Sequence, residues 1–120
     1  SLTGFLRFGG VWDRNDTSTL WLIVYENILE EPIYYESSDC YQIIRNQLLS
    51  VEGDIFSYGA EGERILELKY ERVSDELLEI TRLSDGRVFS FSPSSRDANS
   101  FTPECVSKTN QPLLSDESIN

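Results

Sequence analysis

The stretch RILELKYE, residues 64–71, alternates apolar and charged side chains from its third residue onward. Successive side chains of a β-strand point to opposite faces of the sheet, so a period of two is typical of a strand with one buried face. The apolar face would carry Leu66, Leu68 and Tyr70, and the charged residues between them would face solvent. This stretch therefore predicts a half-buried strand.

The same alternation continues on both sides of this stretch. Residues 78–81 and 89–92 alternate in the same way, and the Asp-Gly pair at 85–86 between them is a strong hairpin signal. Short runs rich in β-branched and aromatic residues precede them at 11–12, 20–25, 32–35, 40–45 and 54–58. We therefore expect an all-β fold, a small antiparallel meander barrel of about eight strands, with a β-sandwich as the alternative.

Two segments also allow a helical interpretation. Residues 25–31 could form a helical turn and residues 42–49 a short helix, but their β-branched and aromatic content favours strands. We expect Pro32 at the start of its strand, where a missing backbone donor is tolerated. Residues 1–106 are predicted to form a single β domain. Residues 107–120 contain few apolar side chains and are predicted to form a loose polar tail.

The charge balance limits the partners of the chain. It has 21 acidic and 10 basic residues, which gives a net charge of -11. Binding to nucleic acid or to an anionic bilayer requires clustered Lys and Arg, so neither partner is expected. The acidic surface is explained by solubility, with capture of a cationic partner as the alternative. No run approaches the roughly 18 apolar residues of a membrane span.

Two cysteines, Cys40 and Cys105, are present. An even number in a small acidic chain predicts a disulfide formed in an oxidising compartment, with two buried free thiols as the alternative. The bridge would fasten an irregular tail to a strand and close a ring of roughly 65 residues, which is worth about 4 kcal/mol in the chain-entropy estimate. Zinc is not expected, because two cysteines without histidine do not complete a usual site.

No catalytic set is visible. The chain has no histidine, which removes the usual general base and the commonest metal ligand. The side chains of the adjacent pair Glu30-Glu31 would face opposite sides of a strand, or would both be solvated in a turn. The loop 13–16 offers oxygen ligands for a weak calcium site, but turn formation explains the same residues. We therefore expect no enzyme activity, no cofactor and no metal.

Aromatic side chains are the best candidates for binding. Inward tyrosines can line a pocket for an apolar ligand and orient it with their hydroxyl groups. The candidate ligand-binding residues are Tyr25, Tyr34, Tyr41, Phe56 and Tyr58. The alternative is that these rings fill the core of a small barrel.

Gly10-Val11-Trp12 ahead of a strand meander resembles the Gly-x-Trp opening of lipocalin-like barrels. The resemblance implies structural roles for Gly10 and Trp12, with the tryptophan closing one end of the barrel beneath an arginine of a late strand. Arg82 and Arg87 are the candidates for that arginine.

A second resemblance covers more of the chain. Gly10-Val11-Trp12-Asp13, the tyrosine pair 34–35 and Asp39-Cys40-Tyr41 are similar to small exported or lipid-anchored proteins of marine bacteria whose function is unknown. It implies an envelope location. The chain begins with Ser1 and has no Met, so we expect its native start upstream, with a secretory or lipoprotein signal removed or a longer chain trimmed.

The expected function is therefore that of a non-enzymatic bacterial protein, periplasmic, anchored to the outer membrane or secreted, which binds a small apolar ligand. One alternative is an interaction module that pairs with itself or with another envelope protein. Another is a carboxylate-dependent glycan hydrolase, which would require two carboxyl groups roughly 5–9 Å apart in a cleft.

Overall fold

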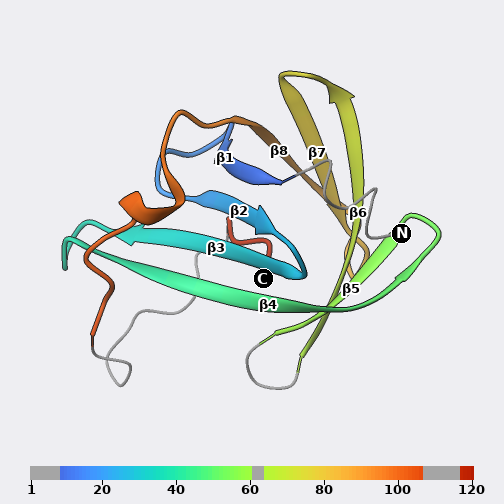
Figure 1. The fold of residues 1–120 in the computed structure, drawn as a ribbon, viewed down its shortest axis with the longest axis horizontal. Helices are drawn as coiled ribbons and strands as arrows, with labels where there is room; N and C mark the ends of the chain where they lie inside the picture. Colours follow the sequence, from blue (N-terminus) through green and yellow to red (C-terminus); the bar gives the residue numbers. More distant parts are fainter. Residues whose placement is uncertain (1–8, 61–63, 107–116) are drawn as a thin grey trace.

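The computed structural model of the protein describes residues 9–60, 64–106 and 117–120, and these contain eight strands (Figure 1). The strands are β1 (Gly10–Arg14), β2 (Trp21–Tyr25), β3 (Ile28–Tyr35), β4 (Cys40–Glu52), β5 (Ile55–Gly59), β6 (Ile65–Ser74), β7 (Leu77–Arg82) and β8 (Arg87–Pro93). Each pairs antiparallel with the next in sequence, and β8 returns to β1, so the sheet closes into a barrel. The predicted antiparallel meander barrel is confirmed, and the sandwich is not formed.

Period-two alternation decides which side chains enter the barrel. On β6, Leu66 and Leu68 are buried while Ile65 and Glu67 are exposed, as the alternation predicted. On β7 and β8, Ile80 faces Phe89 across the ladder and both are buried. The central cluster is Trp12, Leu22, Val24, Leu29, Phe56, Tyr58, Leu66, Leu68, Leu78, Ile80, Phe89, Phe91 and Ile119. The barrel interior is therefore largely filled by its own side chains.

Gly10, Gly53 and Gly86 occupy backbone conformations that favour glycine. Gly86 has φ +73° in the turn between β7 and β8, as the Asp-Gly signal predicted. Gly10 has φ +122° at the first position of β1, where it pairs with Val24. This conformation gives Gly10 a structural reason to be glycine.

β3 and β4 differ in detail from the expectation. Pro32 lies inside β3 and not at its start. The β2–β3 ladder runs to the Ile23–Glu30 pair and is met again at the Leu20–Ile33 bridge, so it is interrupted beside Pro32, which has no backbone donor. β4 has 13 residues and continues well past Arg45. Neither segment with a helical alternative, 25–31 or 42–49, contains a helix.

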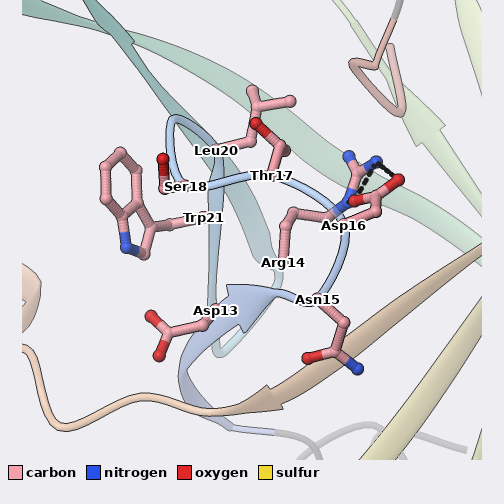
Figure 2. A pocket seen from close by; sticks show the side chains of 8 residues that line it. All are labelled: Asp13, Arg14, Asn15, Asp16, Thr17, Ser18, Leu20 and Trp21. Carbon is pink, nitrogen blue, oxygen red and sulfur yellow. Dashed lines mark hydrogen bonds and ion pairs between the residues drawn. The ribbon is translucent and has the colours of Figure 1, made fainter.

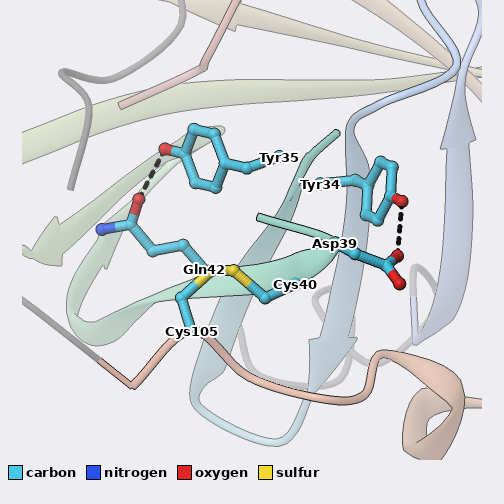
Figure 3. Close-up of a disulfide and its surroundings, with 6 residues drawn as sticks. All are labelled: Tyr34, Tyr35, Asp39, Cys40, Gln42 and Cys105. Carbon is cyan, nitrogen blue, oxygen red and sulfur yellow. Dashed lines mark hydrogen bonds between the residues drawn. A yellow bond between two sulfur atoms is a disulfide. The ribbon is translucent and has the colours of Figure 1, made fainter. Parts of the chain in front are cut away.

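The segment after β8 crosses the outside of the barrel and is fastened to β4 (Figure 1, orange). Cys105 forms a disulfide with Cys40, the first residue of β4, over a sequence separation of 65 (Figure 3). Beside it, the Cys105 amide donates to the Tyr41 carbonyl, and the Tyr41 amide donates to the Pro103 carbonyl. The predicted bridge between strand and tail is therefore present.

Residues 117–120, which we call the plug segment, differ from the predicted loose tail. Ser118 and Ile119 are buried, and Ile119 belongs to the central cluster of the barrel. Figure 1 draws this segment in red inside the ring of strands. The remainder of the expected loose tail, residues 107–116, lies outside the described residues. A single isoleucine in a polar context has no periodicity, so its burial could not be inferred from the sequence.

Candidate functional site: the barrel mouth

One end of the barrel interior is charged. Arg14 follows Trp12 by two positions, Glu31 follows Leu29, and Arg82 follows Ile80, so each continues an inward apolar row. Together with Arg64 and Arg87 they form what we call the barrel mouth: Arg14, Glu31, Arg64, Arg82 and Arg87. The guanidinium groups of Arg14, Arg82 and Arg87 lie 4.8, 5.2 and 4.8 Å from the ring centroid of Phe89.

Glu31 accepts three hydrogen bonds from the plug segment. The Ser118 hydroxyl donates to Oε1 at 2.5 Å, and the Ile119 amide donates to Oε2 at 2.9 Å. The Asn120 side-chain amide donates to Oε1 at 3.0 Å. One carboxylate on β3 therefore holds three consecutive residues that lie about 90 positions further along the chain, as the separations of 87 to 89 show.

Arginines bind the carbonyl groups of the same segment. Arg14 donates to the Glu117 carbonyl. Arg82 Nη1 donates to the carbonyls of Ser118 at 3.1 Å and Ile119 at 3.3 Å. Arg64 donates to the Asn120 carbonyl at 2.9 Å. The plug segment is thus held chiefly along its main chain.

Side-chain contacts add to this main-chain recognition. The side chain of Ile119 is fully buried in the central cluster. The carboxylate of Glu117 accepts from Arg87 at 2.9 Å and lies 3.7 Å from Arg14. The plug segment thus presents one apolar side chain to the core and one acidic side chain to arginines.

The electrostatics of the mouth are those of a buried charge network. Burial raises the pKa of Glu31, while the hydrogen bonds from the plug segment and the charge of Arg14 act in the opposite direction. The Arg14 side chain is itself fully buried, and its guanidinium also binds Asp16 at 3.0 Å. That contact lowers the pKa of Asp16. Glu31 and Asp16 therefore both lie near the positive charge of Arg14, at the end of the barrel that holds the plug segment.

An acceptor inside the barrel has no partner in the described part of the chain. Asn46 on β4 is fully buried, and its amide group donates to the Leu29 carbonyl at 3.1 Å. Its Oδ1 has no hydrogen-bond partner among the described residues, and neither has Oδ1 of Asn120 in the plug segment. A buried acceptor without a partner costs about 1–3 kcal/mol, so both atoms can accept from a ligand or from water.

The candidate ligand-binding residues fall into separate places. Tyr25 is half-exposed on the outer wall. Tyr34 and Tyr41 stack on the outside with centroids 5.0 Å apart, and Tyr34 donates to Asp39 at 2.6 Å (Figure 3). Phe56 and Tyr58 are buried in the central cluster. The five residues therefore do not line one pocket.

The outer aromatic cluster belongs to the tail fastening. Trp21 and Tyr41 pack against Phe101 of the tail at centroid distances of 5.2 and 5.6 Å. The guanidinium of Arg96 lies 4.7 Å from the Trp21 ring and 4.4 Å from the Phe101 ring. These rings bury Phe101 of the tail against β2 and β4.

An arginine lies over Trp12, as the resemblance implied, and it comes from β6. Arg72 on β6 lies 5.3 Å from the Trp12 ring centroid. Arg82 and Arg87 lie over Phe89 instead, because their inward positions bring them to the charged mouth. The resemblance left Arg82 and Arg87 open for this place, and the cation found over the Trp12 ring is Arg72.

The β1–β2 loop forms an open pocket of about 570 Å³ at the outer rim (Figure 2). Asp16 is bound by Arg14, and the carboxylate of Asp13 points away from that pair in Figure 2. Among residues 9–60, 64–106 and 117–120, no group of three or more acidic or cysteine side chains could hold a metal ion. The carboxylates of this loop therefore do not converge.

The adjacent carboxylates Glu30 and Glu31 also separate. Glu30 binds Arg45 through an ion pair of 2.5 Å, while Glu31 binds the plug segment inside the barrel. They face opposite sides of β3, so the two carboxyl groups do not line one cleft. This arrangement does not favour the hydrolase alternative.

Sequence reasoning missed Arg14, Glu31 and the plug segment. A signal existed for the first two, because each is a charged residue at an inward position of an alternating row. The plug segment offered none, since its contacts depend on closure of the barrel around it.

The disulfide indicates an oxidising environment outside the cytoplasm. No helix among the described residues has the length and apolar character needed to cross a membrane. Comparison of the chain with protein-family models, with curated proteins and with solved structures gives no match. A function must therefore be argued from the fold and from the geometry of the mouth.

Proposed function

We propose that this chain is a non-enzymatic binding domain that works in the periplasm, on the outer membrane or in the secreted fraction, with a lipocalin-like barrel whose mouth receives a compact apolar group. The observation that carries the proposal is Ile119. Its side chain is fully buried among the barrel residues, yet it comes from a segment that is not a strand of the barrel.

The barrel closes without the plug segment. Every strand has both of its neighbours, so residues 117–120 add no ladder to the sheet. Their removal would leave a space the size of one branched side chain, lined by apolar residues and bordered by charge. Pockets that combine an apolar lining with a few polar groups are typical of ligand sites. Oδ1 of Asn46, which has no partner within the part of the chain that the structure describes, supplies a further polar atom inside the barrel.

The test uses the full chain and a small branched alcohol, 3-methyl-1-butanol, followed by amide chemical shifts in NMR. Ile119→Ala removes the resident side chain, and we expect saturable shifts in the central cluster at roughly tenfold lower alcohol concentration than in the wild type. In the wild type, binding should be accompanied by displacement of Ile119 from the cluster.

Val88→Ala is the matched control, because Val88 is a half-exposed residue on the outer side of β8. It should bind the alcohol as the wild type does. A folded Ile119→Ala variant without saturable shifts would contradict the proposal, as would wild-type binding that leaves Ile119 in place.

A further inference from the structure

Resting on the proposed function, we infer that the mouth binds a short peptide with a branched aliphatic residue, and that the plug segment is a tethered occupant of this peptide site. A site for a small apolar molecule alone would need no array of groups that bind a peptide main chain. The mouth has such an array.

All four carbonyl groups of residues 117–120 accept hydrogen bonds from arginines. The donors come from three places in the fold: Arg14 on β1, Arg82 on β7, and Arg64 just before β6. Glu31 on β3 accepts from the Ile119 amide. Main-chain groups are common to every peptide, so these contacts recognise a peptide main chain irrespective of its side chains.

Side-chain selectivity comes from two positions. The central residue must place an apolar group in the cluster that holds Ile119. The residue before it must be small and able to donate, because the Ser118 hydroxyl lies 2.5 Å from Oε1 of Glu31. An acidic residue before that is favoured by Arg87. The ligand that fits is a peptide with an acidic residue, a small hydroxyl residue and a branched aliphatic residue in that order.

The site extends beyond the plug segment. A pocket of about 440 Å³ lies beside Asn120, and its lining includes Arg64, Arg82 and Ser84. A peptide longer than four residues can therefore continue past the position of Asn120. This open extension distinguishes a recognition groove from a space shaped only for the resident segment.

Because the plug segment belongs to the same chain, it competes with any free peptide for the site. An intramolecular segment has an effective concentration on the order of millimolar, so a free peptide of the same sequence competes poorly until the tether is weakened. Ile119→Ala should weaken the resident segment by roughly thirtyfold or more, because a buried isoleucine is replaced by alanine.

The probe is a fluorescein-labelled Glu-Ser-Ile-Asn amide, measured by fluorescence anisotropy with the full chain. We expect the Ile119→Ala variant to bind it at least tenfold more tightly than the wild type. A probe with Asp in place of Ile should not bind. Adding Glu31→Gln to Ile119→Ala should weaken binding by about tenfold, because the charged acceptor is lost.

Val88→Ala is the control and should bind the probe as the wild type does. Asn120→Ala is a second test variant, for use if Ile119→Ala does not fold. It removes one hydrogen bond to Glu31 and leaves the core intact, so it should also increase probe binding. If the relieved variants bind the branched alcohol but not the peptide, the peptide inference fails and the proposed function stands. If folded variants bind neither, both fail.

Discussion

At the scale of single residues, Glu31 is the group on which the mouth depends. It faces Arg14 of β1, Arg82 of β7, Tyr35 of its own strand and the donors of the plug segment. Burial is the dominant influence and raises its pKa above the ordinary value of 4.5. The folded state therefore holds the Glu31 proton more tightly than the unfolded state does.

This pKa shift gives stability a pH dependence of defined sign. The contribution of Glu31 is fully present below pH 4.5 and is lost as pH rises through the raised folded-state pKa, at up to about 1.4 kcal/mol per pH unit. Glu31→Gln should lack this loss, so the wild type should become less stable relative to the variant as pH rises. Urea unfolding at a series of pH values measures the difference, and a constant difference would contradict the prediction.

Arg14 should contribute much more to stability than a surface cation does. Its side chain is fully buried and binds the side chain of Asp16 and the carbonyl group of Glu117, so Arg14→Met removes the charged donor of both contacts. We expect a loss of about 2–3 kcal/mol in urea unfolding. Lys69, which is half-exposed and pairs with Asp54, is the control. Lys69→Met should cost less than about 1 kcal/mol, and equal losses would refute the difference.

At the scale of elements, the tail after β8 should be held to the barrel by the disulfide and by the rings beside it. Replacing Cys40 and Cys105 with alanine should lower stability by about 2–4 kcal/mol, because a ring of 65 residues is released in the unfolded state. Trp21 packs on Phe101 of the tail, so its fluorescence should also change. An unchanged unfolding free energy would show that the rings alone fasten the tail.

The same scale shows what could be predicted from the sequence. β6, β7 and β8 alternate so regularly that their inward residues were identified correctly. The length of β4 was not, because the polar pair Asn46-Gln47 interrupts its apolar pattern. In the structure, Asn46 remains inward and bonds the Leu29 carbonyl on the neighbouring strand. When a polar residue takes an inward position because of a tertiary contact, the local sequence gives no sign that the strand continues through it.

The candidate site was less predictable for a related reason. Tyr25, Tyr34 and Tyr41 lie on strands as expected, but which face a side chain occupies depends on the register that closes the barrel. The contact between Glu31 and Ile119 joins residues 88 positions apart. Sequence periodicity describes neighbours within an element, and it cannot identify partners brought together by closure.

At the scale of the whole molecule, the plug segment should open at a lower free energy than the barrel unfolds. The barrel is stabilised by a continuous ladder around all eight strands. The plug segment is held by side chains of the mouth and by its two buried residues, Ser118 and Ile119. A unit with few contacts opens at lower free energy than the sheet to which it is docked.

Native-state hydrogen exchange can measure this separation. The Ile119 amide, which is bonded to Glu31, should exchange through a local opening whose free energy lies well below that of the Leu68 and Ile80 amides in the barrel wall. Ile119→Ala should accelerate exchange at residues 118–120 and leave the Leu68 amide unchanged, whereas Val88→Ala should alter neither. If the Ile119 amide exchanges only with global unfolding, the segment is a fixed part of the core, and a peptide site that exchanges its occupant loses its physical basis.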